Sequence, residues 1–442
     1  MDRGGDPTLP PPAKSPKLSD TTTIAGGDPT LLPPAEFPKL SDTTAIESDT
    51  TTINSLGEDL LLAIFLHLPS LATLTRAAFT CRAWRRAVAS SPAFRRRFRE
   101  LHRAPLLGLV AEPHRDALPC FAPAPRRDRD VLAAIRGGDF SLTTLLDPDD
   151  WAGDAPLSWR IHDCKDGYLV LLNWDTGLLA TVNPLTLQFT EYIEMPFNRN
   201  TGSSKPGCPI SLDVHLIFSD EEPMSFRLVW LFHKDSEVQV AVFTSETGDW
   251  FFHPWVDIVE RTPPHFVGEN WLHFGLQSNG KLYWPFTNLK HMLKLDTETM
   301  EFSVWKLPPH LEQSNSYVVG ETMNGTLWIV YCSGWSIDVL RYGVDDGGEE
   351  RWIFVGMIEY DEGANPLANN DTLHVVTMKD GFVYLATSEM ILSLCLETME
   401  LEKLFPRSFR AHHFQPYIMA WPPSLVGNYG SFAAMQDGPN AP

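Results

Sequence analysis

Between residues 55 and 98, apolar residues recur at intervals of three and four, which is the spacing of an amphipathic α-helix. Ser55 and Glu58 have the spacing of a capping box, so Ser55 is expected to cap the first helix, and Pro69 ends it. The apolar stripe of this helix contains Leu60, Leu61, Ile64, Phe65 and Leu68. Three shorter helical segments are predicted to begin near Ser70, Cys81 and Ser90.

This helical segment has more apolar surface than it can bury alone. Its second helix is expected to carry Leu71, Leu74 and Phe79. Domains this small usually need a partner or a covalent staple, because too little of their surface becomes buried on folding. Each aliphatic side chain contributes ~1.5–3 kcal/mol when it is fully buried. We therefore expect part of the first helix to pack against another protein.

Beyond about residue 105 the pattern changes to the two-residue alternation of β-strands. An Asp-Gly or Asn-Gly pair, which suits a type I′ hairpin turn, precedes a strand at Asp166, Asn279, Asn324 and Asp380. A second pattern consists of a strand, then a turn that contains threonine, then an apolar strand. It recurs at Thr186, Thr247, Thr299 and Thr398. Both series repeat at about 50 residues, with one member missing from each.

A repeat of this length with about four short antiparallel strands is typical of a propeller blade. Five blades can be counted between Trp159 and Phe405. The apolar runs 106–110 and 417–421 are expected to pair and to complete a further blade. The prediction is an α+β multidomain chain whose mostly antiparallel, kelch-like β-propeller has about six blades. A pair of β-sandwiches is the alternative, which the even spacing disfavours.

Residues 4–25 recur almost unchanged as residues 26–47, and both copies are rich in proline, threonine and aspartate. Solenoid repeats keep apolar positions while their surface residues drift, whereas here the polar residues are copied as faithfully as the others. Too few apolar groups are present to offset the entropy of ordering. We therefore predict a disordered tail over residues 1–54.

The composition of the chain indicates the cellular compartment and disfavours one class of binding partner. The 442 residues carry a formal charge of −21, which disfavours a general nucleic-acid binder. No stretch is long and apolar enough to span a membrane, and the N-terminus lacks the apolar core of a signal peptide. The six cysteines form no CxxC motif and are too few for a disulfide scaffold. These features favour a cytoplasmic or nuclear protein.

One segment departs from the acidic composition. Residues 76–136 contain 14 arginines and five acids, a charge of about +9. Such a patch could bind nucleic acid, although no reader fold surrounds it. Because the arginine fork pairs well with carboxylates, we expect Arg95, Arg96, Arg97 and Arg99 to solvate the last helical turns and to face the acidic remainder of the chain. Contact with an acidic partner is the other possibility.

The helical segment resembles a known family. The run Leu56-Gly-Glu-Asp-Leu-Leu-Leu-Ala-Ile-Phe-Leu-His-Leu-Pro69, then Leu74, Cys81-Arg-Ala-Trp84 and Ser91-Pro92-x-Phe94, is similar to an F-box. Gly57, Thr73 and Thr80 depart from the usual proline, aspartate and valine of that motif. The C-terminal region, ending in Tyr417-Ile-Met-Ala-Trp-Pro-Pro-Ser-Leu425, resembles the propeller-like domain of plant-type F-box proteins. An ordinary helical hairpin is the alternative for the first segment.

The resemblance implies a domain order and a function. It implies a three-helix F-box that docks on a Skp-type adaptor and through it joins a cullin-based (SCF-type) ubiquitin ligase, while the propeller binds a protein substrate. The implied adaptor-binding residues are Leu56, Leu60, Leu61, Ile64, Phe65, Leu68, Leu74 and Trp84. The domains expected are the tail over 1–54, the F-box over 55–98, an Arg-rich connector with a first propeller strand over 99–157, the propeller over 158–425 and a disordered end over 426–442.

No motif in the chain indicates catalysis, so no catalytic, cofactor or metal residue is predicted. Gly-x-Ser-x-Gly, Walker and HExxH motifs are missing from the sequence. The pair His412-His413 and the triple His162-Asp163-Cys164 are strand neighbours, which point to opposite faces. Seven tryptophans are expected to fill blade cores and not to form a carbohydrate platform: Trp174, Trp230, Trp250, Trp284, Trp328, Trp335 and Trp352. Two alternatives stay open: an F-box scaffold acting outside the ligase, and a propeller that binds glycans or hydrolyses a substrate.

Overall fold

The computed structural model describes residues 56–426, apart from short gaps. These gaps are residues 113–117, 126–127, 146–158, 174, 187–189, 196–208, 219–224, 259–270, 279, 310, 312–313, 315, 323–324, 346, 361–372 and 408–413. The chain divides into units 1–52 and 53–442, and the described residues all belong to the second. The predicted tail at 1–54, all of the predicted C-terminal tail at 426–442 except Val426, and His412-His413 therefore lie outside the described residues.

Four helices form the N-terminal part of the described chain. They are α1 (Glu58–Phe65), α2 (Leu71–Ala78), α3 (Arg82–Ser90) and α4 (Pro92–Leu101). The predicted start of the first helix is wrong, because α1 begins at Glu58 with Gly57 in the capping position. The other predicted starts are confirmed, since the Ser70 and Ser91 hydroxyls accept hydrogen bonds from Thr73 N and Phe94 N at 3.2 Å.

The capping hydroxyl of Ser70 gives a first testable expectation. It satisfies one of the backbone N–H groups that the first turn of α2 leaves without a helical partner. Replacing Ser70 with alanine is expected to destabilise the protein by about 1 kcal/mol, the usual loss for an N-cap. Urea unfolding of the S70A variant would measure this loss, and an unchanged midpoint would show that water replaces the cap without cost.

The helices share one apolar core. Phe65, Leu74 and Phe98 are buried in it, and the ring of Trp84 meets that of Phe65 edge-on at 5.4 Å. Leu425, from the other end of the described chain, is fully buried in the same cluster. Because a residue more than 300 positions away completes this core, the helices do not form a self-contained module.

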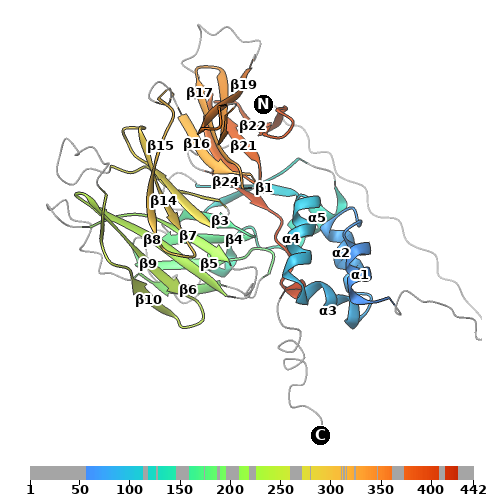
Figure 1. The fold of residues 1–442 in the computed structure, drawn as a ribbon. Helices are drawn as coiled ribbons and strands as arrows, with labels where there is room; N and C mark the ends of the chain where they lie inside the picture. The colour runs from blue at the N-terminus through green and yellow to red at the C-terminus, as the bar shows by residue number, and fades with distance from the viewer. Residues whose placement is uncertain are drawn as a thin grey trace, which may run out of the picture. The chain divides into compact units, whose positions relative to one another are not determined.

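The rest of the described chain forms a six-bladed β-propeller of antiparallel sheets, which confirms the predicted fold class (Figure 1). The first two blades contain β3 (Trp159–Lys165), β4 (Tyr168–Asn173), β5 (Leu178–Val182) and β6 (Thr190–Glu194), then β7 (Ile210–Phe218), β8 (Phe226–Lys234), β9 (Glu237–Thr244), β10 (Asp249–Phe252) and β11 (Val256–Asp257). The third contains β12 (Leu276–Ser278), β13 (Lys281–Pro285), β14 (His291–Asp296) and β15 (Phe302–Lys306).

The remaining blades follow the same order. The fourth contains β16 (Ser316–Glu321), β17 (Leu327–Ser333), β18 (Ser336–Val344) and β19 (Glu350–Glu359), and the fifth β20 (His374–Lys379), β21 (Phe382–Ala386), β22 (Met390–Cys395) and β23 (Leu401–Pro406). The sixth joins β1 (Leu106–Ala111), β2 (Cys120–Pro123) and β24 (Phe414–Ile418). This blade closes the ring from both ends of the propeller, as the apolar runs predicted, with Ala111 opposite Phe414.

The predicted glycine turns are present wherever the structure describes both of their residues. Asp166 and Gly167 both have positive φ, as do Asp380 and Gly381, which a type I′ turn requires. Asn279 and Asn324 lie outside the described residues, but the glycine after each has positive φ. These turns join the first and second strands of a blade, and the threonine turns join the third and fourth. In an antiparallel blade both turns lie at the same end.

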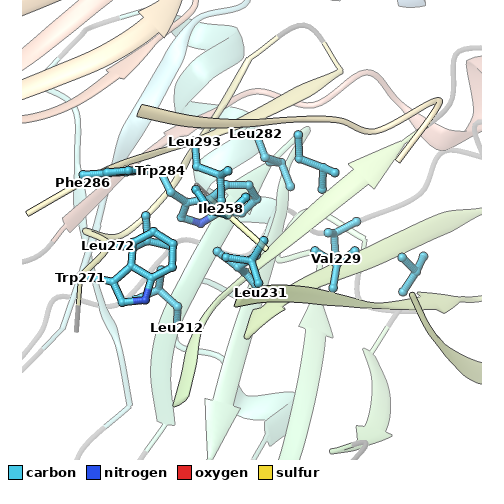
Figure 2. Close-up of a cluster of buried hydrophobic side chains, with 14 of the residues drawn as sticks. Leu212, Val229, Leu231, Ile258, Trp271, Leu272, Leu282, Trp284, Phe286 and Leu293 are labelled. Carbon is cyan, nitrogen blue, oxygen red and sulfur yellow. The ribbon is translucent and has the colours of Figure 1, made fainter. Parts of the chain in front are cut away.

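Apolar side chains between neighbouring blades form the core. Figure 2 shows the cluster between the second and third blades, where Val229 and Leu231 of β8 lie near Leu282 and Trp284 of β13. Trp230 and Trp284 are fully buried, which confirms blade cores as the place of these two tryptophans. Trp174 lies outside the described residues.

The Arg-rich connector contains an element that the sequence pattern did not predict. Helix α5 (Arg129–Gly137) follows β2, and Asp128 caps it by accepting hydrogen bonds from Asp130 N and Val131 N. Arg76 of α2 forms an ion pair with Asp130 of α5. Arg95 is buried rather than solvated and donates to the backbone oxygen of Ala89. The arginine network is therefore partly internal to the helical region.

Candidate functional site

The helix α1 presents apolar side chains on two faces. Leu61 and Phe65 point into the helical core, and Phe65 is only 2% exposed. Leu60 and Ile64 lie one turn apart on another face, with 54% and 40% of their surface exposed. Residues four apart are neighbours on a helix, so these two side chains form one small apolar ridge. We call Leu60 and Ile64 the α1 ridge.

The other predicted adaptor-binding residues support this ridge from beneath or beside it. Leu61, Phe65 and Leu74 are buried, while Leu56, Leu68 and Trp84 are half-buried. Direct contact of a partner with Phe65 would require the helices to move apart, because Trp84 already covers its ring. The structure thus divides the predicted set into two exposed residues and a group that holds α1 in place.

Phe79, an apolar residue of the predicted second helix, lies at the C-terminal cap of α2 and is half-exposed. The guanidinium of Arg85 lies 5.1 Å from the centre of its ring. A cation over an aromatic face contributes about 0.5–1 kcal/mol at an exposed position, which stabilises Phe79 outside the core. The helical spacing alone gave no signal for this placement.

The helices are fastened to one end of the propeller. Arg85 Nε donates to the backbone oxygen of Ser424 at 3.0 Å, and the rings of Phe98 and Trp421 meet edge-on at 5.7 Å. The helix η6 (Pro423–Leu425) packs on α3 (Figure 1). These contacts fix the direction in which the α1 ridge faces relative to the blades.

A second fastening lies at the turn between β22 and β23. Arg103, just after α4, forms an ion pair with Glu397 in this turn, and its guanidinium lies 4.9 Å from the centre of the Phe382 ring. Glu397 belongs to one of the threonine turns. The helices therefore contact the propeller end that carries the glycine and threonine turns, and the opposite end carries the turns between second and third strands.

The propeller interior holds a polar cluster that the sequence analysis did not identify. His215 Nε2 lies 3.2 Å from Asp213 Oδ2, and His215 Nδ1 lies 4.0 Å from Asp163 Oδ2. Burial alone would lower the pKa of His215, but the Asp213 carboxylate outweighs it and raises that pKa above its ordinary value. Burial alone would raise the pKa of Asp213, but His215 and the hydrogen bonds to Asp213 lower it.

The hydrogen bonds of this cluster are structural. Asp213 accepts from Gly275 N and from Trp284 Nε1, and Asp163 accepts from Leu216 N at 2.8 Å. Each carboxylate thus joins the innermost strand of its own blade to the next blade. A bulge in β3 before Asp163 and another in β7 next to Asp213 direct the two side chains across the blade boundary. An alternation of His and Asp in an apolar strand was the signal available in the sequence.

The triple His162-Asp163-Cys164 does not form a nucleophilic site. Asp163 points toward the second blade, whereas the thiol of Cys164 donates to the backbone oxygen of Pro416 in β24. Burial raises the pKa of Cys164 to about 11. A thiol with such a pKa stays protonated near neutral pH and is a poor nucleophile.

Within the described ranges, no three His, Cys, Asp or Glu side chains are grouped as ligands for a metal ion. Among the described helices, none has both the length and the apolar character needed to cross a membrane. The five described cysteines, Cys81, Cys120, Cys164, Cys332 and Cys395, are free thiols.

Two family models match the chain. The model described as "F-box protein AT5G49610-like, beta-propeller" matches residues 160–425, more than half of the chain. The model described as "F-box-like" matches residues 53–100, the range that includes α1 to α3 and most of α4. No curated protein matches the chain significantly.

Solved structures show only a distant likeness to the chain. The structure of apo AztD from Citrobacter koseri has 8% identity and a TM-score of 0.32, over 57% of this chain and 72% of that chain. The N-terminal domain of Nup159 has 9% identity and a TM-score of 0.30, over 57% and 62%. A chain of the Nidogen/Laminin complex has 11% identity and a TM-score of 0.31, over 58% and 83%. At these values the likeness carries no argument about function.

Proposed function

Because the chain belongs to the family of F-box proteins with an AT5G49610-like β-propeller, we propose that it is a substrate-recognition subunit of an SCF-type ubiquitin ligase. Its α1 ridge binds a Skp-type adaptor, which connects the chain to a cullin. The propeller binds a protein substrate that is not yet identified. The family and the combination of F-box and propeller support this function.

The observation that carries the proposal is the exposure of Leu60 and Ile64 on a helix whose inner face is already packed. Leaving such side chains in water forfeits stabilisation of about 25 cal/mol per Å² of apolar surface. The ridge has no packing role in the helical core, so a groove on another protein is the arrangement that recovers this free energy. Helix-in-groove recognition uses anchors with the same i, i+4 spacing.

Catalysis in this proposal belongs to the rest of the ligase. The fastening of the helices by Arg85 and Arg103 holds the propeller in a set direction from the adaptor. A substrate bound to the propeller is thereby kept at high effective concentration near the ubiquitin donor. The chain then needs no catalytic residue of its own, and it acts in the cytoplasm or the nucleus, where the ligase operates.

The proposal predicts that replacing the ridge by carboxylates abolishes adaptor binding. In the double variant L60D/I64D both substituted positions are exposed in the isolated chain, so the fold is expected to persist. Loss of two buried aliphatic anchors at ~1.5–3 kcal/mol each corresponds to a fall in affinity of about a hundredfold or more. Co-purification and calorimetric titration with a purified Skp-type adaptor measure this loss.

The matched control is Leu101→Asp, which alters another exposed leucine, at the end of α4. It is expected to leave adaptor affinity unchanged. Equal binding by L60D/I64D and by the unchanged chain would refute the assignment of the ridge. Adaptor binding without ubiquitin transfer to any propeller-bound protein would instead favour a scaffold acting outside the ligase.

A further inference from the structure

A surface groove of about 700 Å³ lies between the outer strands of the third and fourth blades. Leu307 and Leu340 contribute its apolar lining, and Trp305, Tyr342 and Trp352 contribute aromatic rings. The indole nitrogen of Trp352, in β19, donates to the backbone oxygen of Lys306 at 3.0 Å. This hydrogen bond connects the two blades across the groove and sets the position of the indole ring.

The three rings form a continuous row. The ring centres of Trp305 and Tyr342 are 5.0 Å apart, and those of Tyr342 and Trp352 are 5.3 Å apart. All three side chains are half-buried, so each ring leaves part of its surface to solvent. Trp352, which the sequence analysis expected in a blade core, packs against the core cluster of these blades and also lines the groove.

Cations surround the groove in a chain whose net charge is −21. Lys306 and Arg351 are exposed where they line it, and the Lys294 ammonium lies 4.9 Å from the centre of the Trp305 ring. Arg351 forms an ion pair with Asp345, in which Nε of Arg351 lies 2.6 Å from Oδ2 of Asp345. Among the described lining residues, Glu350 is the one carboxylate, and it accepts a hydrogen bond from the Tyr342 hydroxyl at 3.5 Å. Among the described lining residues, Lys306 and Arg351 outnumber Glu350, and Asp345 offsets part of the charge of Arg351.

The apolar surface continues from the groove along β19. This outer strand has ten residues, whereas the outer strands β6, β15 and β23 have five, five and six. Phe354 and Met357 of β19 are more than half exposed. Proteins usually keep edge strands short and charged, because a long apolar edge invites association with another chain.

We propose that this groove binds an extended, acidic, proline-containing segment of the protein that the chain recruits. The inference rests on the proposed function only for the statement that the bound protein is a substrate. Proline-rich segments form a preformed extended helix and dock in aromatic-lined grooves at low entropic cost. Carboxylates that flank the prolines meet Lys306 and Arg351, which fixes the orientation of the segment.

A glycan is the rival ligand for a row of aromatic rings. The apolar lining of Leu307 and Leu340 and the cations at the rim favour a polypeptide, because a neutral sugar offers neither apolar side chains nor carboxylates. Selection from random peptides and binding assays with oligosaccharides separate the two ligand classes.

The test selects peptides from a phage-displayed library of random sequences on the immobilised full-length chain. Acidic sequences that contain proline are expected to be enriched. For a selected peptide, the double variant K306E/R351E is expected to lower the affinity about tenfold or more, because it reverses two charges at the rim. Binding is also expected to weaken as sodium chloride is raised, and to change the tryptophan fluorescence of the chain.

The matched control is Lys403→Glu, which changes an exposed lysine on β23, the outer strand of the fifth blade. It is expected to leave peptide affinity unchanged. Selected peptides without acidic residues or proline, equal affinity for K306E/R351E, or binding of oligosaccharides instead of peptides would each overturn the inference. Adaptor binding by K306E/R351E is measured in parallel, since its loss would concern the proposed function and not the groove.

Discussion

A chain that ends at residue 413 is expected not to form a folded propeller. Strand β24 pairs with β1 to complete the sixth blade, and this truncation removes it. Phe414 and Tyr417, which are almost completely buried, go with it. Loss of each buried aromatic costs about 3–5 kcal/mol, and two such losses approach or exceed the total stability of about 5–15 kcal/mol of a typical domain.

The helices are expected to be affected by the same truncation. Leu425 is removed from their core, together with the Ser424 oxygen that accepts from Arg85. Size-exclusion chromatography and urea unfolding followed by tryptophan fluorescence would show aggregation or a missing cooperative transition. A chain that ends at residue 426 keeps every described contact and is the control. A monomeric, cooperatively unfolding chain of 413 residues would show that the ring closes without β24.

Most of the propeller could be predicted because its signals are local. The turn at Asp166-Gly167 requires positive φ at two successive residues. The adjacent residue types Asp and Gly are enough to indicate this requirement in the sequence. The closing pair, β1 and β24, could be predicted because the five repeats that can be counted left one apolar run unused at each end. The run placed at 417–421 is nevertheless displaced, since β24 occupies Phe414–Ile418 and Trp421 packs on the helices.

The candidate site could be predicted only as a set of residues. Leu60 and Leu61 are adjacent on a helix with apolar residues on both faces, so spacing does not show which one points inward. Trp84 decides this, because its ring packs on Phe65 and thereby defines the inner face. The position of α3 beside α1 is therefore needed to identify Leu60 and Ile64 as the exposed ridge.

Long-range polar contacts could not be predicted at all. The ion pair of Arg103 with Glu397 joins residues 294 positions apart, and the threonine-turn pattern that contains Glu397 does not indicate its partner. The carboxylate of Asp213 reaches Trp284 across a blade boundary because a bulge in β7 redirects it. Bulges depend on how two sheets meet, and a single sequence has no local pattern for that.

Replacing Asp213 with alanine is expected to destabilise the propeller by about 3–5 kcal/mol, the usual effect of removing one partner of a buried ion pair. The substitution leaves His215 without its closest carboxylate and leaves the N–H groups of Gly275 and Trp284 without their acceptor. Urea unfolding at neutral pH measures the loss. The control is Asp257→Ala, an exposed carboxylate on β11, for which a change within about 0.5 kcal/mol is expected.

The isosteric variant Asp213→Asn separates the contribution of the charge from that of the hydrogen bonds. The quantity to compare is the free energy of unfolding of the two chains as a function of pH. In the unchanged chain the pKa of Asp213 is lowered, so its stabilisation is lost as pH falls below about 4, the ordinary aspartate value. The pKa of His215 is raised, so its contribution is complete below about 6.5 and is lost as pH rises through the raised value.

The advantage of Asp213 over asparagine is therefore expected to be largest between about pH 4 and pH 6.5 and to shrink on either side. Asp163, 4.0 Å from His215, remains in the variant and retains part of the effect at the alkaline side. Urea unfolding of both chains across this range gives the difference directly. A difference that stays constant with pH would mean that the hydrogen bonds to Gly275 and Trp284, and not the charged pair, hold the two blades together.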